Sequence, residues 1–208
     1  AAVSVLEDSA LFNAGKGSVF ATDGVQRMDA SLMDGSSGLA GSLCGVKCIR
    51  NPIKAARLVM LQTPHVMLYG EDAEDLSREH GLEIVDPSWF HTDYRWDQLV
   101  RAREANALIL DHEQVPRLPS ENSKGTVGAV ACDLHGNLAA ATSTGGLVNK
   151  RRGRVGDSAI IGAGTFAKNS TCAVSATGHG ELFIRSNVAG RLSALIELAG
   201  LSLSAAAN

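Results

Sequence analysis

The stretch that decides the fold reads Thr126-Val-Gly-Ala-Val-Ala-Cys-Asp133, then Leu134-His-Gly136, then Asn137-Leu-Ala-Ala-Ala-Thr-Ser-Thr144. Two runs of small and β-branched residues flank a turn in which Gly136 can take a positive φ. This pattern predicts a β-hairpin with a three-residue loop and a glycine bulge. Thr126 and Thr144 each lie nine residues from His135. A register centred on that turn therefore places them opposite each other, with Cβ atoms about 5 Å apart.

Two opposed threonines at one end of a hairpin can support nucleophilic chemistry. A threonine hydroxyl is a weak nucleophile unless a base takes its proton. If the bond before Thr126 were cut, the new α-amino group, with a pKa of about 7.7–8.0, would lie beside the hydroxyl and could serve as that base. Gly125 allows the sharp backbone bend that attack on its own carbonyl needs. The alternative is that both threonines are ordinary β-branched strand residues.

The segment before the hairpin has the composition of a linker. Residues 109–125 lose all periodicity and contain two prolines, two serines, an asparagine and a glycine. Such a stretch inside a compact domain usually marks function or cleavage. We therefore expect one domain over residues 1–208, with an α-subunit part at 1–125 that ends in the linker 109–125, and a β-subunit part at 126–208.

Composition excludes several classes of protein. The chain has 208 residues, a net charge of −3 and 45% hydrophobic residues, which is typical of one globular domain. No apolar run approaches the roughly 18 residues of a membrane helix. The negative charge and the 4% of aromatic residues argue against a nucleic-acid partner. We expect neither a membrane nor a nucleic acid as partner.

The four cysteines form no CxxC pair and have no histidine at zinc-ligand spacing. We expect reduced, mostly buried thiols in a reducing compartment, which favours a cytoplasmic location. Gly15-Lys-Gly-Ser18 fails the pattern of a phosphate-binding loop, because Ala10 stands where the first glycine belongs. No cofactor is expected to be required.

A basic cluster in the C-terminal third has two interpretations. Lys150, Arg151, Arg152 and Arg154 lie close together in sequence. Most charge runs of this kind are solvated loops. The other interpretation is a site for an acidic small molecule.

The loop Gly153-Arg-Val-Gly-Asp157 places a cation and an anion three residues apart. A free α-amino acid needs such a pair, because arginine can fork onto its α-carboxylate and aspartate can hold its α-ammonium. The alternative is a salt bridge within the loop. Thr177-Gly-His-Gly180 offers a hydroxyl and backbone N–H groups that suit an oxyanion hole, or else forms a plain turn.

The remaining elements are predicted from periodicity and capping signals. Strands are expected at 18–21, 25–33 and 65–69. A helix should begin at Pro52 after the N-cap Asn51 and run through Leu61. Further helices are expected at 71–80, ended by Gly81, at 93–108, and at 187–199. The last of these has Val188, Leu192, Leu195, Ile196 and Ala199 on one face.

Taken together, these motifs resemble one family. The matching segments are Gly125-Thr-Val-Gly-Ala-Val-Ala131, Ala141-Thr-Ser-Thr-Gly-Gly146, Gly153-Arg-Val-Gly-Asp-Ser158 and Ala176-Thr-Gly-His-Gly-Glu181, and the segments 11–15, 28–31, 51–57 and 200–203 fit the same family. They resemble the plant-type L-asparaginases, or isoaspartyl peptidases, which are N-terminal-nucleophile hydrolases. The resemblance implies an α+β fold, a four-layer αββα sandwich. The chain looks truncated at both ends relative to that family, so we expect residues 1–208 alone to be poorly stable and weakly active.

The resemblance also implies roles for single residues. Cleavage is expected between Gly125 and Thr126, with Thr126 as the nucleophile, Thr144 assisting it and Asn13 near both. Arg154 and Asp157 would hold the α-carboxylate and α-ammonium of the substrate. Thr177 and Gly178 would form the oxyanion hole and contact the substrate.

The family further implies an optional structural sodium ion, bound through backbone carbonyls. The matching residues here are Leu6, Glu7, Ser9, Phe12, Ala14 and Lys16. The implied substrates are L-asparagine and β-aspartyl dipeptides. The implied assembly is a dimer of heterodimers, each made of two subunits from one precursor.

Two other functions remain open from the sequence. Glycosylasparaginase shares the fold and the nucleophile, although it is secretory or lysosomal. An inactive truncated fragment of the asparaginase fold is the second alternative.

Overall fold

The computed structural model describes residues 1–105, 108 and 125–208. Its centre is a five-stranded sheet in the order β3-β2-β1-β5-β4. The strands are β1 (Met28–Asp34), β2 (Ala40–Val46), β3 (Met67–Tyr69), β4 (Val127–Cys132) and β5 (Leu138–Thr144). Strands β2 and β3 run parallel, and the other neighbours are antiparallel.

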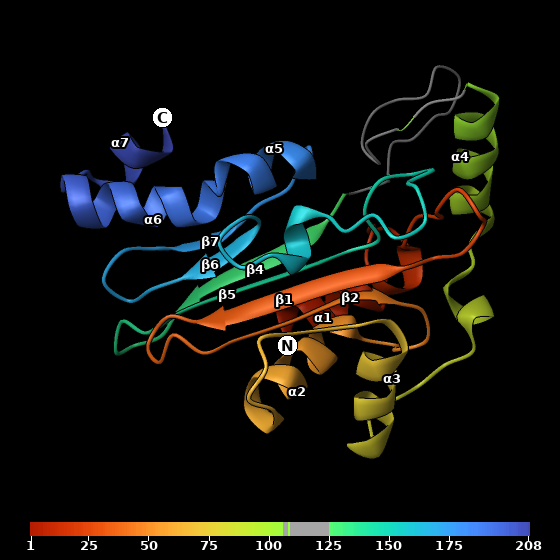
Figure 1. The fold of residues 1–208 in the computed structure, drawn as a ribbon, viewed down its shortest axis with the longest axis horizontal. Coiled ribbons are helices and arrows are strands. Elements are labelled where there is room, and N and C mark those ends of the chain that lie inside the picture. The colour runs from red at the N-terminus through yellow and green to blue at the C-terminus, as the bar shows by residue number, and fades with distance from the viewer. Residues whose placement is uncertain (106–107, 109–124) are drawn as a thin grey trace.

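Two groups of elements cover the two faces of this sheet (Figure 1). On one face lie α1 (Ala2–Glu7), α2 (Pro52–Gln62) and α3 (Gly70–Glu79). On the other lies a second sheet of β6 (Thr165–Ala167) and β7 (Ala173–Ser175), followed by α5 (Gly180–Ser186), α6 (Val188–Ala199) and α7 (Leu203–Ala207). This order of layers confirms the αββα sandwich.

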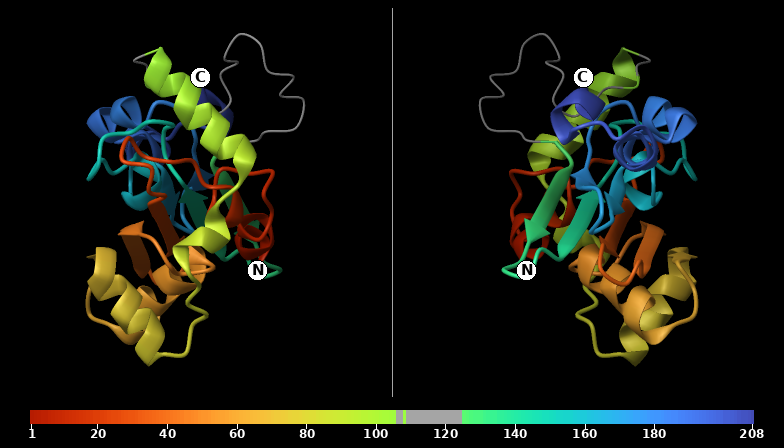
Figure 2. Two further views of the ribbon diagram at one scale, coloured as in Figure 1. Left: turned by 90° about the vertical axis from the view of Figure 1, so that its right-hand side faces the viewer. Right: turned by 90° about the vertical axis from the view of Figure 1, so that its left-hand side faces the viewer.

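Helix α4 (Asp93–Glu104) stands at one end of the sheets, clear of both faces (Figure 2). Within the described residues, three short 3₁₀ turns complete the fold: η1 (Gly15–Gly17), η2 (Pro87–Phe90) and η3 (Asp157–Ala159). In the part of the chain that the structure describes, no helix combines the length and the apolar character needed to cross a membrane.

The two faces of β1 have different chemistry. Met28 and Ala30 point into the apolar core beneath α2. Helix α2 can approach β2 closely because residue 41 is a glycine. A Cβ at this position would lie 2.0 Å from the carbonyl oxygen of Ala56. Ser31 points the other way and donates to the carbonyl of Ser158 at 2.6 Å. The space between the two sheets is therefore lined by small polar groups.

Most predicted elements are confirmed. The hairpin, the helix beginning at Pro52 and the helix ending before Gly81 lie where expected, and α4 fills the first part of the range 93–108. The predicted linker at 109–125 lies outside the described residues except for Gly125. All four cysteines are free, and only Cys132 is exposed.

One expected strand does not form, and one helix was not expected. Residues 18–21 form only isolated bridges, from Phe20 to Gln26 and from Ala21 to Lys150, because neighbouring loops supply their partners. Helix α6 lies where expected; its buried residues are Ala189 and Ser193, and the five apolar residues expected on one face are half-buried or exposed. Helix α1 was not predicted.

Candidate active site

The two predicted threonines meet. In the β4–β5 ladder Val127 pairs with Ser143, which sets Thr126 opposite Thr144. Their hydroxyl oxygens lie 2.9 Å apart, within hydrogen-bond distance. Thr144 is buried, and its oxygen also accepts the backbone N–H of Gly146 at 2.9 Å. The hydroxyl of Thr144 is thus fixed by the backbone and lies against that of Thr126.

Asn13 connects the peptide before Thr126 to the end of β5. Its backbone N–H donates to the carbonyl of Gly125 at 3.2 Å, and its own carbonyl accepts from Gly145 at 3.0 Å. Its side chain donates to the carbonyl of Gly146 at 2.7 Å and accepts from the N–H of Val19 at 3.0 Å. Asn13 is fully buried. The carbonyl of Gly125 is therefore held by a donor that is itself fixed on both sides.

A small cleft joins the threonines to the other predicted site residues. Its lining residues are Thr126, Thr144, Gly146, Leu147, Arg154, Gly156, Asp157, Ser158, Thr177 and Gly178. Segments far apart in sequence thus converge as the motifs implied. Thr177 is exposed, and Gly178 has a φ of +152°. Phe183 would lie 2.8 Å from a Cβ at Gly178, so this loop can keep its course only with glycine there.

Arg154 has a partner that the sequence did not reveal. Its Nε and Nη2 donate to the two carboxylate oxygens of Glu181 at 2.9 and 3.0 Å. These bonds lower the pKa of Glu181. Arg154 therefore forms its salt bridge with Glu181 and not with Asp157. One edge of the guanidinium is held by Glu181, while Nη1 points toward Gly146 and Gly156.

Asp157 is buried with one oxygen uncommitted. Its Oδ2 has no hydrogen-bond partner among the described residues. Burial raises the pKa of this carboxyl. Glycines leave it room, since a Cβ on Gly164 would lie 2.7 Å from Oδ2 and one on Gly180 would lie 2.7 Å from Oδ1. A ligand cation would supply both the charge and the donor that this carboxylate lacks.

The basic cluster divides between two environments. Arg151 and Arg152 are exposed, as expected of a solvated loop. Lys150 is only 1% exposed, and its Nζ donates to the carbonyl of Arg27 at 2.8 Å. The sequence pattern could not separate these residues, because the partner of the buried Lys150 is the carbonyl of Arg27, just before β1 and 123 positions away.

The loop from Leu6 to Lys16 folds back on itself with its carbonyls close to the backbone. A Cβ on Gly15 would lie 2.3 Å from the carbonyl oxygen of Glu7, and one on Gly17 would lie 2.1 Å from that of Phe12. Only glycines permit these approaches. The carboxyl of Glu7 is buried beneath β5 and accepts from the hydroxyl of Ser143 at 2.6 Å. Burial raises its pKa to about 7.

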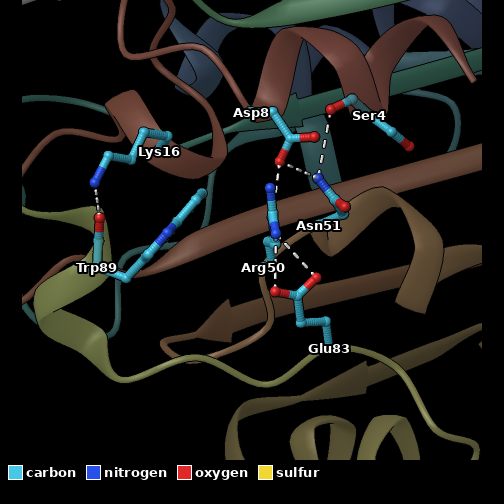
Figure 3. A network of polar contacts seen from close by, with 7 residues as sticks. All are labelled: Ser4, Asp8, Lys16, Arg50, Asn51, Glu83 and Trp89. Carbon is cyan, nitrogen blue, oxygen red and sulfur yellow. Dashed lines mark hydrogen bonds and ion pairs between the residues drawn. The ribbon is translucent and has the colours of Figure 1, made fainter.

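A polar network anchors this loop from outside (Figure 3). Asp8 accepts from Arg50 at 3.1 Å and from Asn51 at 3.2 Å. Arg50 reaches on to Glu83 at 2.8 Å. The side chain of Asn51 therefore binds α1 and does not cap its own helix. At the far end, the ammonium of Lys16 donates to the carbonyl of Trp89.

Comparison with known proteins identifies the family. The family model described as Asparaginase matches residues 1–208. The chain belongs to this asparaginase family. The isoaspartyl peptidase of Escherichia coli K12 is 53% identical over 205 residues, which cover 99% of this chain and 64% of that protein. The isoaspartyl peptidase of Salmonella typhimurium is 51% identical over 97% of this chain and 64% of its own length.

A eukaryotic relative shows a similar match. The putative isoaspartyl peptidase/L-asparaginase of Dictyostelium discoideum is 47% identical, covering all of this chain and 67% of its own length. The chain thus spans about two thirds of the length of these relatives. The asparaginase-family match includes every segment that lines the cleft, and therefore also the threonine pair, Arg154 and Asp157.

Proposed function

We propose that the whole protein is an autoprocessing amidohydrolase. It would hydrolyse L-asparagine to L-aspartate and ammonia, and would cleave β-aspartyl dipeptides, with Thr126 as an N-terminal nucleophile. The observation that carries this proposal is the 2.9 Å contact between the hydroxyls of Thr126 and Thr144, in a cleft shared with Arg154 and Asp157. The names of the relatives support the choice of substrates, and they favour it over glycosylasparaginase.

Self-cleavage is the first step of the proposal. The hydroxyl oxygen of Thr126 attacks the carbonyl carbon of Gly125, the C–N bond breaks, and the chain is joined for a time through an ester. Water then hydrolyses the ester, leaving a carboxylate on Gly125 and a free α-amino group on Thr126. The N–H of Asn13, 3.2 Å from the Gly125 carbonyl oxygen, is placed to stabilise the negative charge that develops there.

Turnover uses the same nucleophile. The new α-amino group takes the hydroxyl proton of Thr126, and the oxygen attacks the side-chain carbonyl carbon of the substrate. The amide C–N bond breaks, and ammonia or an amino acid leaves with the proton. Water then releases aspartate from the β-aspartyl ester. Arg154 and Asp157 hold the α-groups, Thr177 and Gly178 receive the oxyanion, and Thr144 orients Thr126.

One mass spectrum tests the first step. The purified protein, incubated at neutral pH, should give two chains split between Gly125 and Thr126. Thr126→Ala should stay as one chain, whereas Thr126→Ser should still cut. Ammonia release from asparagine should follow the appearance of the split chains. A wild-type protein that stays whole and releases no ammonia contradicts the assignment and favours the inactive alternative.

A structural sodium ion is a further part of the proposal. Its ligands would be the carbonyl oxygens of Leu6, Glu7, Ser9, Phe12, Ala14 and Lys16. Oxygen-only ligation suits a hard cation, and the close backbone approaches at Gly15 and Gly17 support a carbonyl-rich loop. The ion would stabilise this loop. The melting temperature should be higher in sodium chloride than in choline chloride of equal ionic strength, and equal values contradict the site.

The assembly and location complete the proposal. The two chains are proposed to remain together, because β5, which follows the cleavage point, pairs with β1, which precedes it, and β4 pairs with β5. A dimer of such heterodimers is the proposed assembly. A cytoplasmic location is supported by four free thiols, three of them buried. Size-exclusion chromatography with light scattering would measure the assembly, and a monomeric mass would contradict it.

A further inference from the structure

Asp29 connects the nucleophile strand to the substrate loop. It pairs with Thr144 in the β1–β5 ladder, and it is only 1% exposed. One carboxylate oxygen accepts the N–H of Gly45 at 2.9 Å, and the other accepts the N–H of Gly156 at 3.4 Å. Gly156 lies between Arg154 and Asp157 in sequence. A single side chain thus joins the strand opposite Thr144 to the loop proposed to bind the substrate.

A strand irregularity makes this contact possible. The register of β1 against β2 shifts between Met28 and Ala30, opposite the segment that contains Gly45. Gly45 has a φ of +71°. A bulge leaves an extra residue without its ladder partner and re-aims nearby side chains, often next to active sites. The carboxylate of Asp29 takes up the N–H of Gly45 at this bulge.

Lys150 carries the opposite charge in the same region. Burial lowers the pKa of Lys150, and the charge of Asp29 acts against that effect. A Cβ on Gly146 would lie 2.9 Å from the Nζ of Lys150 and 3.2 Å from Nη1 of Arg154. The buried ammonium therefore adjoins both the loop after Thr144 and the guanidinium proposed to bind the α-carboxylate. Neither Asp29 nor Lys150 lines the cleft.

We infer that Asp29 and Lys150 are positioning residues, which hold Arg154 and Asp157 in register with the Thr126–Thr144 pair. The inference rests on the proposed function. Removing the carboxylate of Asp29 would leave the N–H of Gly156 without its acceptor and would remove a negative charge that favours the charged form of the buried Lys150, and both changes act on the substrate loop. The strand pairing that sets Thr126 against Thr144 uses backbone bonds and would remain.

Because the losses act on the substrate loop and not on the threonine pair, Asp29→Asn should weaken substrate binding more than it slows catalysis. The KM for asparagine should rise about tenfold or more, since even one weakened charged hydrogen bond has that effect. The value of kcat should stay within about threefold of wild type, and self-cleavage should go to completion. Affinity for L-aspartate, measured by calorimetry, should fall in parallel with KM. A residue that merely supports folding would lower kcat, cleavage and melting temperature together.

The matched control is Asp34→Asn on the same strand. The carboxylate of Asp34 is exposed and binds only the local turn, through Ser36 and Ser37. The KM of the Asp34→Asn variant for asparagine should equal that of wild type. Lys150→Met should act in the same direction as Asp29→Asn. The rise in KM should be smaller for the double variant than for the two single effects combined, because the double variant leaves no unbalanced buried charge.

The outcomes separate the inference from the proposed function. A wild-type protein that neither cuts itself nor binds L-aspartate overturns the proposed function. A wild type that does both, with an Asp29→Asn variant equal to it in KM and affinity, overturns the inference alone. If both single variants fail to fold, the double variant is decisive. A folded double variant with a raised KM supports the inference, and one with a normal KM, or one that does not fold, overturns it.

Discussion

Replacing Arg154 by lysine tests whether this guanidinium binds the α-carboxylate of the substrate. In the structure, Nε and Nη2 of Arg154 are engaged with Glu181 at 2.9 and 3.0 Å, and Nη1 points toward the glycines of the cleft. A planar guanidinium can serve Glu181 on one edge and a ligand carboxylate on another. A lysine ammonium is a point charge and cannot hold both in fixed positions.

The expected magnitude follows from the hydrogen bond that is lost. A hydrogen bond to a charged group contributes about 1.5–3 kcal/mol. That corresponds to a rise in KM for asparagine of about 10- to 150-fold, at about 1.4 kcal/mol per factor of ten. Self-cleavage at Thr126 should survive, because that step needs no free amino acid.

Steady-state ammonia release measures KM and kcat, and an electrophoretic gel measures self-cleavage. Arg152→Lys is the matched control, since Arg152 lies two residues away in the same loop and is exposed. An Arg154→Lys variant whose KM stays within twofold of wild type would show that Arg154 does not bind the α-carboxylate. Loss of cleavage in the same variant would show that Arg154 acts on the precursor instead.

Three further changes test the rest of the cleft. Thr144→Val leaves the N–H of Gly146 without its acceptor and Thr126 without its hydroxyl partner, so kcat should fall by about 10²–10⁴ while KM stays near wild type in the ammonia assay. Burial raises the pKa of Asp157. Its carboxylate should therefore take up a proton at a pH above the range usual for aspartate, and kcat/KM should begin to fall there as the pH decreases. The same raised pKa means that the folded state loses stability as pH rises through it, so Asp157→Asn should raise the melting temperature at pH 8 but not below pH 4. Gly180→Ala places a methyl group 2.7 Å from Oδ1 of Asp157 and 2.9 Å from Nη2 of Arg154; its KM should rise with little change in melting temperature, and an unchanged KM would contradict the assigned pocket.

The hairpin could be predicted from sequence because local chemistry determines it. Alternation of small and β-branched residues fixes the two strands, and Gly136, with a φ of +81°, fixes the turn between them. Once the turn is placed, the pairing of Thr126 with Thr144 follows by counting. The helix that begins at Pro52 was predictable for the same reason, since its start depends only on neighbouring residues.

Partners from distant segments could not be predicted in this way. Glu181 stands 27 positions after Arg154, and only the close approach of α5 to the loop before η3 brings them together. Lys150 looked like part of a solvated run because charge composition carries no information on burial. Asn51 had the right residue type for a helix cap, but α1 offered its side chain Ser4 and Asp8 instead.

The charges around the cleft support the proposed binding of an α-amino acid. Arg154 is neutralised by Glu181 through two bonds, and the charge of Asp29 favours the charged form of the buried Lys150. Asp157 is left with an oxygen that has no partner among the residues described, in surroundings that raise its pKa. A ligand that brought only a carboxylate would leave this buried anion uncompensated. A ligand that brings an α-ammonium as well supplies the missing donor and counter-charge. The cleft therefore favours a ligand that carries an ammonium group. In the proposed binding mode, with Arg154 holding the α-carboxylate, the side-chain amide of the substrate would lie toward Thr126.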